Sequence, residues 1–469
     1  MKHLLSFYFY LCVIAFSLSA SDTTTIIILH TNDMHSHINK FSPLASYVDS
    51  LRKKYQNVFL FSAGDIFTGN PIVDKYKKPG YPIIDLMNYI GYDVTEYGNH
   101  EFDYGQNILL NRINQAKFPF ICANMIVTSQ SILEQPEPLT TFYTKDSLKI
   151  IVLGLLQIGK NGLPDAMPEK IKGITFKNPL KTVKKYKSYR DSCNVFILLS
   201  HLGFKTDKKL AAKYPFFDAI VGGHSHTVLP NGFWQNNTLI TQAGHYTNYL
   251  GLLSIKLVNG QVIERSDTLL PLVMDTYCHY QTSKIIYQYN QNLELHTVIG
   301  EAKKDITAPY GLGALMTEAA KDRTGTDIAF QNIGGIRLQK IPAGNITIKQ
   351  IYELAPFENT YVTYNLTPKQ IKQIIKYAYN IHKKNELVAS GIKFTPVIKN
   401  HRLQSIDISD NKGNPLKKKR YSVTINNYMA SAWKLKFLKY GNNTGIKDSE
   451  TIINFIKKRK LLISNRLCF

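Results

Sequence analysis

The chain has 469 residues, of which 44% are hydrophobic and 12% aromatic. This length exceeds what one core usually organises, so we expect two or three domains, and the composition excludes a largely disordered chain. The formal net charge is +23, which suits an anionic partner or reflects a bias that spreads lysine everywhere. The densest basic run, Lys417–Arg420, precedes a strand-like segment and predicts an exposed turn. No nucleic-acid-binding motif accompanies this charge, so no nucleic-acid partner is expected.

The N-terminus has the pattern of a secretory signal peptide. Lys2 precedes an apolar run, Leu4–Phe16, and small residues follow it, so we expect residues 1–20 to be removed after Ala20. The run is too short to span a bilayer comfortably, and no other segment reaches that length. Cys12 lies in a poor lipoprotein cleavage site. We therefore expect secretion across the inner membrane into a bacterial periplasm, with a lipoprotein or surface form as the less favoured alternative.

Cysteine usage is sparse outside this leader. No Cys-x-x-Cys pair occurs, so thiolate metal ligation is not expected. An oxidising compartment would permit a disulfide, but the pairing cannot be read from sequence, and buried free thiols fit equally well. The four cysteines beyond the leader are Cys122, Cys193, Cys278 and Cys468.

In the first half of the chain, short apolar runs alternate with helix-like stretches such as Ser42–Tyr55 and Tyr81–Gly91. This alternation indicates a layered α/β fold with buried strands. Polar clusters follow strand after strand, where active sites of such folds form. The expected strands are Thr25–Leu29, Val58–Phe61, Lys149–Leu156, Val195–Leu199 and Phe217–Val221.

A polar stretch, Cys278–Leu295, predicts a helix that could link two domains. A second α/β pattern follows, in which Thr367 is expected to cap a helix that begins at Pro368. No internal repeat is visible. The predicted divisions are the signal peptide 1–20, a first domain 21–275, a linker helix 276–297 and a second domain 298–469.

Seven polar side chains follow the expected strands in short motifs, and each is weak evidence alone. Imidazoles, carboxylates and one carboxamide, without thiolates, suit Zn, Mn, Fe or Co. They are too many for one tetrahedral ion but enough for two ions that share a carboxylate. Two such ions could bind a water nucleophile and the oxygens of a phosphoester. The residues are Asp33, His35, Asp65, Asn99, His201, His224 and His226.

The order D-x-H, G-D, G-N-H-[ED], H and G-H-x-H resembles the calcineurin-like metallophosphoesterase superfamily. The spellings HTNDMHSH, SAGDIFTGNP, YGNHEFDYG, LSHLG and VGGHSHT resemble, more narrowly, its secreted 5′-nucleotidase and UDP-sugar hydrolase family. The resemblance covers nearly all of the mature chain. It implies an N-terminal four-layer α/β/β/α metallophosphoesterase domain and a C-terminal α/β nucleotide-binding domain.

The resemblance also implies two divalent metal ions with a shared ligand, Asp65. One ion would be held by Asp33, His35, Asp65 and His226. The other would be held by Asp65, Asn99, His201 and His224.

Beside the metals, the same motif implies two catalytic residues. His100 would face the phosphoryl group and stabilise or protonate the leaving oxygen, and Asp103 would orient that imidazole and keep it protonated. Glu101 is expected to be structural or a capping residue. A sister family of cyclic-nucleotide phosphodiesterases and 3′-nucleotidases is expected to carry Asn where this chain has Asp103, which favours the 5′-nucleotidase reading.

The segments QNIGGIR and LAPFENT resemble nucleotide-binding motifs of the family. They imply that Asn332 bonds the base or ribose and that Arg337 pairs with phosphate or carboxylate. Phe357 and Tyr428 would form an aromatic clamp on the base. From the residues alone, ordinary core packing of these two rings is the alternative.

The chain departs from the family pattern after Tyr428. The usual Gly-Gly-Asp-Gly stretch is replaced by NNYMASAWKLKF, and Lys434 stands about where the acid should be. An arginine that often precedes the first helix of this domain is also absent, and Lys303 and Lys304 could substitute for it. These departures concern recognition of the ribose and base and leave the metal motifs intact.

The sequence therefore predicts a secreted phosphohydrolase that uses two metal ions to remove the 5′-phosphate of nucleotides. The alternatives on the same scaffold are a UDP-sugar hydrolase, a 2′,3′-cyclic-nucleotide phosphodiesterase with 3′-nucleotidase activity, and a thiosulfate-ester hydrolase. A catalytically silent binding protein is the alternative of a different class. The resemblance also implies closure by rotation of the second domain, with a hinge near the polar helix. No oligomeric state is predicted.

Overall fold

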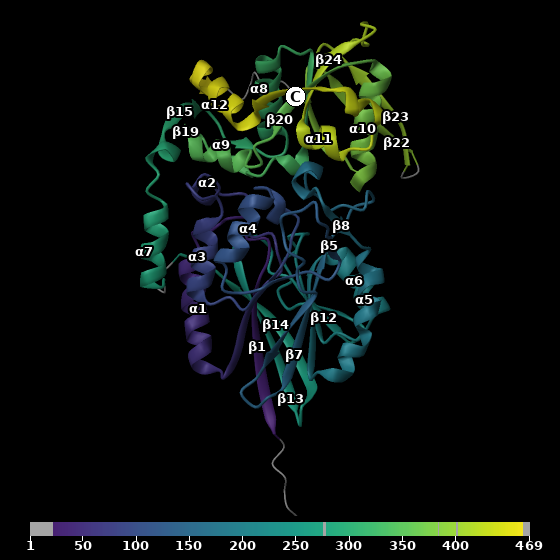
Figure 1. The fold of residues 1–469 in the computed structure, drawn as a ribbon. Helices are drawn as coiled ribbons and strands as arrows, with labels where there is room; N and C mark the ends of the chain where they lie inside the picture. The colour runs from purple at the N-terminus through teal and green to yellow at the C-terminus, as the bar shows by residue number, and fades with distance from the viewer. Residues whose placement is uncertain (1–21, 275–277, 383, 400–401, 463–469) are drawn as a thin grey trace, which may run out of the picture.

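The computed structural model describes residues 22–274, 278–382, 384–399 and 402–462 (Figure 1). The predicted signal peptide, its cleavage site, Cys12 and Cys468 lie outside these residues. Two α/β domains stand one above the other in Figure 1. In the described part of the chain, no helix combines the length and apolarity needed to cross a membrane. The three described cysteines, Cys122, Cys193 and Cys278, are free thiols.

Two six-stranded sheets form the centre of the N-terminal domain. The first sheet has the order β14 (Gln261–Pro271), β13 (Tyr249–Val258), β1 (Thr23–Thr31), β2 (Asn57–Ser62), β3 (Val94–Glu96) and β4 (Phe120–Ile121). The second has the order β11 (Phe233–Gln235), β12 (Thr238–Thr241), β10 (Ala219–Gly222), β9 (Val195–His201), β7 (Lys149–Leu156) and β6 (Leu139–Tyr143). A small pair, β5 (Met125–Val127) and β8 (Ile174–Phe176), lies beside them.

The side chains of β1 alternate between two cores. Ile26 and Ile28 pack between the two sheets, whereas Ile27 and Leu29 pack with the helices on the outer face. This alternation follows from the two-residue period of a strand, and every one of these positions is apolar because both faces are covered. Strands of the second sheet divide their side chains in the same way.

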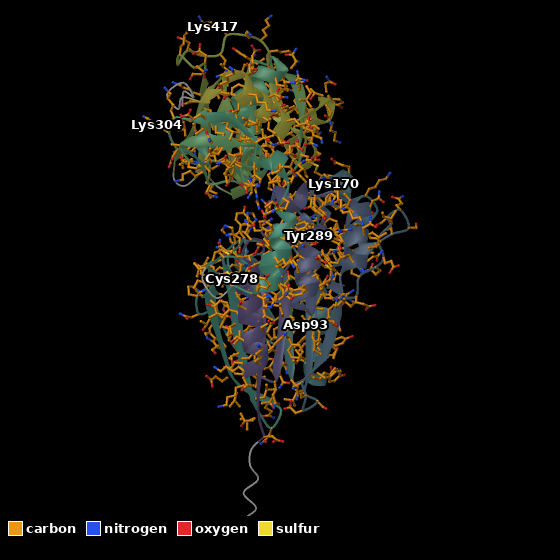
Figure 2. All side chains as sticks on the ribbon, turned by 90° about the vertical axis from the view of Figure 1, so that its left-hand side faces the viewer. Asp93, Lys170, Cys278, Tyr289, Lys304 and Lys417 are labelled. Carbon is orange, nitrogen blue, oxygen red and sulfur yellow. The ribbon has the colours of Figure 1, made fainter. Side chains whose placement is uncertain are left out.

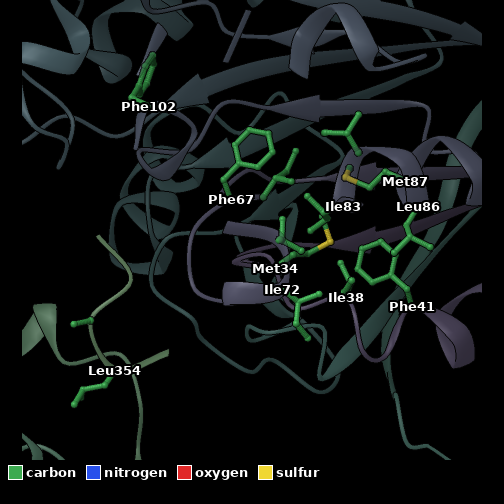
Figure 3. Packing of buried hydrophobic residues seen from close by; sticks show 14 of the residues in the cluster. Met34, Ile38, Phe41, Phe67, Ile72, Ile83, Leu86, Met87, Phe102 and Leu354 are labelled. Carbon is green, nitrogen blue, oxygen red and sulfur yellow. The ribbon is translucent and has the colours of Figure 1, made fainter. Parts of the chain in front are cut away.

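Helices cover the outer face of each sheet. On one side lie α1 (Phe41–Lys54), α2 (Pro71–Asp74), α3 (Tyr81–Ile90) and α4 (Gln106–Gln115), and on the other α5 (Pro179–Val183) and α6 (Phe204–Lys213) (Figure 1). Figure 3 shows Phe41, Ile83 and Met87 gathered around Met34, which comes from the loop after β1. The predicted four-layer α/β/β/α arrangement is therefore confirmed.

The boundary predicted at Phe217–Val221 differs from the structure, because β10 begins only at Ala219. The carboxylate of Asp218 accepts hydrogen bonds from the backbone of Phe196 and from Arg190, so this residue belongs to the loop before the strand. Short 3₁₀ turns connect other elements: η1 (His100–Phe102), η2 (Pro168–Ile171), η3 (Lys184–Ser192), η4 (Leu293–His296), η5 (Ile333–Gly335) and η6 (Lys436–Tyr440).

The C-terminal domain is built on a five-stranded sheet with helices on both faces. Its order is β21 (Leu387–Ser390), β17 (Ile328–Asn332), β24 (Tyr421–Asn426), β20 (Thr360–Leu366) and β25 (Asn442–Lys447). One face carries α8 (Tyr310–Thr324) and α12 (Asp448–Arg459), and the other carries α10 (Pro368–His382) and α11 (Asn427–Ala432). The predicted α/β class of this domain is confirmed.

Smaller elements complete this domain. They are α9 (Ile348–Leu354), the sheet β19 (Gly344–Thr347), β15 (Val298–Ala302) and β26 (Leu461–Leu462), the pair β16 (Ile306–Thr307) and β18 (Lys340–Ile341), and the hairpin β22 (Lys393–Lys399) and β23 (Arg402–Ser409). The predicted basic turn, Lys417–Arg420, is an exposed loop before β24. Figure 2 places Lys417 at the end of this domain that lies away from the N-terminal domain.

The predicted cap of α10 is confirmed. The backbone N–H of Gln370 donates to Thr367 Oγ1 at 3.3 Å, and the backbone N–H of Thr367 donates to Gln370 Oε1 at 2.9 Å. This reciprocal pair is a capping box, which satisfies two of the free N–H groups at a helix start.

The helix predicted over Cys278–Leu295 is shorter in the structure. It spans α7 (Tyr280–Tyr289), and η4 follows after a break. The break arises because Asn290 and Gln291 turn their side-chain amides back to the carbonyls of Ile286 and Tyr287, which ends the helix. In Figures 1 and 2, α7 runs along the N-terminal domain toward the C-terminal domain, with Tyr289 near the junction.

Candidate functional site

The loops at the carboxyl ends of the central strands converge on one place. β1, β2 and β3 are parallel neighbours in one sheet, and β9 and β10 are parallel neighbours in the other. Their loops therefore emerge at the same edge. The structure brings together there all seven candidate metal ligands: Asp33 and His35 after β1, Asp65 after β2, Asn99 after β3, His201 at the end of β9, and His224 and His226 after β10.

The backbone at five of these seven residues lies in the left-handed region, with φ between 48° and 71°. Such conformations cost free energy for residues other than glycine and cluster at functional sites. Hydrogen bonds between loops hold them: the N–H of Asp33 donates to Gly64 O at 3.0 Å, and the N–H of His35 donates to Asp65 O at 2.9 Å. The five residues are Asp33, His35, Asp65, His224 and His226.

One group of possible ligand atoms is formed by Asp33, His35 and His226, whose ligand atoms all lie within 4.8 Å of one another. His35 Nε2 is 3.1 Å from His226 Nε2, and His226 Nε2 is 3.4 Å from Asp33 Oδ1. Two imidazole nitrogens and a carboxylate oxygen pointing at one place form a donor set that suits a borderline divalent cation.

A second group is formed by Asp65, His201 and His224, with Asn99 beside them. His201 Nε2 lies 3.1 Å from Asp65 Oδ2, and His224 Nδ1 lies 3.0 Å from Asn99 Oδ1. His201 is fully buried, and its Nε2 atom faces the Asp65 carboxylate. Imidazole nitrogens and a carboxylate oxygen gathered at one buried place form a second donor set that suits a borderline divalent cation.

Asp65 lies between the two groups. Its Oδ2 atom is 3.8 Å from His35 Nε2 and 3.1 Å from His201 Nε2. Its Oδ1 atom accepts a hydrogen bond from the backbone N–H of His100 at 2.8 Å. The carboxylate is therefore placed to face both groups, as a bridging ligand must.

Backbone carbonyls fix the orientation of two of the imidazoles. His201 Nδ1 lies 2.7 Å from Ala63 O, and His35 Nδ1 lies 3.1 Å from Thr68 O. Such a contact holds the proton on Nδ1, which leaves the lone pair of Nε2 free for a cation.

Glycines are required where the loops approach one another. A Cβ atom on Gly98 would lie 2.2 Å from Asp65 Oδ1, and one on Gly223 would lie 2.6 Å from Ala63 O and 2.8 Å from His201 Nδ1. No real side chain fits at these distances. The G-N-H and G-G-H spellings of the two motifs therefore have a steric cause.

The ionisation of the site follows from burial and from its carboxylates. Burial and the Arg337 guanidinium hold the pKa of His35 well below its usual value, and burial together with His201 lowers the pKa of His224. Burial also acts against charge on His201, but Asp65 outweighs it and raises the pKa of His201 to about 10. Burial would raise the pKa of Asp65, but its histidine neighbours hold it well below the usual value.

His100 and Asp103 form a hydrogen-bonded pair at the edge of the cluster, with His100 Nδ1 2.6 Å from Asp103 Oδ2. Burial lowers the pKa of His100, but the carboxylates of Asp103 and Asp65 outweigh it and raise the pKa above its ordinary value. Glu101 accepts hydrogen bonds from the backbone N–H groups of Asp65 and Ile66. It therefore supports the loop after β2, which agrees with its expected structural role.

A cavity of about 840 Å³ lies between the two domains, next to the cluster. Its N-terminal wall includes Asp65, Asn99, His100, Asp103, His224 and His226, and its C-terminal wall includes all four predicted substrate-binding residues, Asn332, Arg337, Phe357 and Tyr428. Lys170 lies at the level of the junction in Figure 2 and also lines it. Phe357 and Tyr428 thus face a cavity, which argues against plain core packing.

Two of these residues contact the N-terminal domain directly. The Phe357 ring stacks on His100, with centroids 5.3 Å apart and an interplanar angle of 13°. The Arg337 guanidinium lies over Phe357 at 5.6 Å, and its Nη2 group is 3.0 Å from His35 Nε2. The C-terminal domain thus reaches both candidate catalytic and candidate metal-binding side chains.

Several neighbours of the site were not predicted from sequence. Asn99 Nδ2 donates to Asp165 O at 3.2 Å, and Gln157 Nε2 donates to Asp165 Oδ2 at 2.6 Å near His224. His245 stacks on His226 with ring centroids 4.7 Å apart. Of these residues only Gln157 directly follows a strand, β7, and it stands there as a single polar residue without a motif.

The residues that depart from the family pattern lie in different places relative to the cavity. Lys434 lines the cavity, so its replacement of an acid alters the substrate side of the site. Lys303 and Lys304 are exposed and do not line the cavity, so the structure does not support them as substitutes for the absent arginine (Figure 2).

Two family profiles match the chain: "Calcineurin-like phosphoesterase" over residues 26–228 and "5'-nucleotidase, C-terminal domain" over residues 294–439. The chain is 25% identical to a 5'-nucleotidase of Vibrio vulnificus over 525 residues, which cover 95% of this chain and 93% of that protein. It is 26% identical over 499 residues to the trifunctional nucleotide phosphoesterase protein YfkN of Bacillus subtilis. That match covers 92% of this chain but only 34% of YfkN.

Among solved structures, a 5'-nucleotidase precursor from Thermus thermophilus superposes with a TM-score of 0.82 at 25% sequence identity. The superposition covers 93% of this chain and 97% of that one. Both domains are thus similar to known proteins in sequence and in fold.

Proposed function

Because the chain belongs to the 5′-nucleotidase family of calcineurin-like metallophosphoesterases, we propose that it removes the 5′-phosphate of nucleotides with two divalent cations. The enzyme class, a metal-dependent phosphoesterase, follows from the family. The observation that carries the nucleotide substrate is the cavity that joins the ligand cluster to Asn332, Phe357 and Tyr428. We retain the predicted divisions 21–275, 276–297 and 298–469 as proposals.

The converging donors fit two cations. Asp33, His35, Asp65 and His226 would hold one, and Asp65, Asn99, His201 and His224 would hold the other. Their chemistry suits Zn, Mn, Fe or Co. When bound, the pair would supply positive charge for the phosphoryl oxygens and acidify a water nucleophile.

The side chains around this pair would handle the proton and the substrate. His100, held by Asp103 at 2.6 Å, would stabilise or protonate the leaving 5′-oxygen. Arg337 would turn from His35 to the phosphate, where a guanidinium forms paired hydrogen bonds. Phe357 and Tyr428 would hold the base, and Asn332 would donate to the base or ribose.

Lys434 favours a second candidate on the same scaffold. An ammonium group in the cavity wall would suit a substrate with a further negative charge, such as the diphosphate of a UDP-sugar. The Asp103 carboxylate beside His100 speaks instead for a 5′-monoester. The two readings share the metal site and differ only in the preferred ester.

The test is phosphate release from AMP, 3′-AMP, cyclic 2′,3′-AMP, ATP and UDP-glucose with Mn²⁺ or Zn²⁺. We expect AMP to lead, and His100→Ala to lose turnover while it keeps its metals. An aryl phosphate serves as the control for an intact metal site. If AMP were inert while another ester was cleaved, the roles given to Asn332, Phe357 and Tyr428 would be wrong.

We also propose that the protein is secreted into a periplasm, because the leader at residues 1–20 has the composition of a signal peptide. Expression with and without these residues, followed by cell fractionation, tests the proposal. Activity retained in the cytoplasm with the leader present would contradict it.

A further inference from the structure

Glu386 is an acidic residue in the C-terminal wall of the cavity that no motif predicted. Of the described residues of the C-terminal domain, it is the only acidic one that lines this cavity. Its side chain is 14% exposed, and its carboxylate is 3.1 Å from the ammonium group of Lys384. Lys384 is itself 71% exposed, so this ion pair contributes little and does not account for the carboxylate.

The backbone holds Glu386 firmly next to Asn332. β17 and β21 pair with Asn332 opposite Leu387, and the N–H of Ile333 donates to Glu386 O at 3.0 Å. A residue fixed by a sheet ladder positions a ligand more accurately than one on a free loop.

Asn332 and Glu386 offer complementary hydrogen-bonding groups. Asn332 Oδ1 accepts from Asn426 Nδ2 at 2.8 Å, which leaves the Asn332 amide N–H₂ group to donate. An ionised glutamate only accepts. The cavity wall that also carries the Phe357 and Tyr428 rings therefore includes both a donor and an acceptor.

We propose that Glu386 is a specificity-determining residue that accepts hydrogen bonds from donor groups of the nucleoside. The donors are the ribose hydroxyls or the exocyclic amine of the base, and the inference rests on the proposed nucleotide substrate. Charge-assisted hydrogen bonds are the strong ones, and a ligand without donors would leave the carboxylate unpaired. Glu386 would thus favour a nucleotide over a simple phosphate ester at the same metal site.

The experiment compares wild type, Glu386→Gln, Glu386→Asp and Lys384→Gln. For each, kcat/KM is measured on AMP, 2′-deoxy-AMP, 3′-deoxy-AMP, IMP and p-nitrophenyl phosphate. We expect Glu386→Gln to lose about tenfold or more on AMP, through KM, and to stay within about twofold on p-nitrophenyl phosphate. Glu386→Asp should recover part of the loss, and Lys384→Gln should resemble wild type.

The substrate analogues identify the donor. If a ribose hydroxyl donates to Glu386, the deoxynucleotide that lacks this hydroxyl will have a lower kcat/KM than AMP with the wild-type enzyme. For that deoxynucleotide, Glu386→Gln will lower kcat/KM only slightly further. If the base amine donates, IMP will behave in this way. A uniform loss on every substrate, no loss at all, or an equal loss in Lys384→Gln would overturn the proposal.

The outcome for wild type separates this proposal from the proposed function. Wild type that cleaves p-nitrophenyl phosphate but not AMP would refute the nucleotide substrate, and the role of Glu386 with it. Wild type that prefers AMP, with a Glu386→Gln variant of unchanged preference, would refute only the role of Glu386.

Discussion

Asp65 is the residue on which most of the geometry of the site depends. It faces both histidine groups through Oδ2, and its backbone carbonyl and its Oδ1 atom bind the loops of His35 and His100. Its own backbone N–H is held by Glu101. A single residue therefore couples loops that come from different strands through both its side chain and its backbone.

Replacement of Asp103 by asparagine should affect proton transfer and spare the metals. Without the carboxylate, burial would lower the pKa of His100, because Asp103 is the first contact that raises it. We expect Asp103→Asn to lose about 10- to 100-fold in kcat. If His100 acts in its protonated form, activity is lost as pH rises through its pKa, so the alkaline limb of the pH–rate profile should move to lower pH.

The profile is measured by phosphate release between about pH 5 and 9, a range that brackets the ordinary pKa of histidine, and metal content is measured by elemental analysis. An unchanged alkaline limb, or a loss of bound metal equal to the loss of turnover, would count against this role of Asp103.

A second prediction concerns Gly98. A Cβ atom there would press on Asp65 Oδ1, so Gly98→Ala should weaken metal binding. Gly325→Ala is the matched control, because Gly325 also resists a side chain, through its φ of 67° after α8, but has open space around it. We expect the control to lose about 1 kcal/mol of stability and no metal affinity. Metal titration of both variants checks this, and equal affinities would contradict it.

The candidate metal ligands could be predicted because each stands in a short motif, and all but Asn99 lie at or soon after the end of an apolar strand. Gln157, Asp165 and Glu386 could not, because each is a single polar residue in a loop of ordinary composition. Only the tertiary approach of that loop to His224 or Asn332 gives the residue a neighbour. The spacing of residues along the sequence does not indicate which loops approach one another in the fold.

At the scale of helices and strands, the pattern of apolar residues and the helix caps predicted which elements form more accurately than where each element ends. The strands buried on both faces were predictable because all their positions are apolar, as in Lys149–Leu156, which is β7 without any change. α7 was overestimated, because helical composition continues through Asn290 while the asparagine side chain ends the helix. Hydrogen bonds from an amide side chain to backbone carbonyls compete with continuation of the helix, and the periodicity of apolar residues does not predict them.

The start of α12 provides a prediction on stability. Burial raises the pKa of Asp448 to about 7, and its Oδ2 atom has no hydrogen-bond partner. The folded-state pKa of Asp448 lies above the ordinary value of 3.8. The protonated carboxyl therefore makes its full contribution to the free energy of unfolding below about pH 4, and this contribution is lost as pH rises through about 7. Ionisation then costs the folded state up to about 4 kcal/mol.

Asp448→Asn removes this ionisation, and the new amide could donate to the buried, unpartnered Oδ1 atom of Asn359. We expect the variant to exceed wild type in free energy of unfolding by about 1–3 kcal/mol at about pH 8. At about pH 4 the difference should be small, because the carboxyl is then protonated in the folded state and largely protonated in the unfolded state. Urea unfolding at the two pH values measures it, and an equal difference at both would refute the assignment.

At the scale of the whole molecule, the two domains meet through a few side chains around the cavity. Phe357 stacks on His100, Arg337 reaches His35, and Lys75 pairs with Glu358. Neither half of the sequence alone predicts this meeting, because it depends on how α7 and the segment after it place the second domain. The resemblance implied a hinge near the polar helix, and α7 ends at Tyr289 within that stretch.

If the break after α7 is the hinge, a continuous helix should slow turnover. The double change Asn290→Ala and Asn292→Ala removes the amide that ends α7 and the cap of η4. We expect kcat to fall several-fold while metal affinity stays the same. Gln288→Ala, a change at an exposed position within α7, is the control. Equal losses in turnover and metal affinity, or no loss in turnover, would reject the hinge.

The loops that carry the ligands are tied to one another by main-chain hydrogen bonds, such as Asp33 N–H to Gly64 O and Tyr246 N–H to Asp33 O. None of these bonds requires a cation. The pocket for the ions would therefore keep its shape when they leave, and the protein could trade one ion for another without refolding. The metal ions found in the purified enzyme would then reflect the metal supply around the protein more than any preference built into the chain.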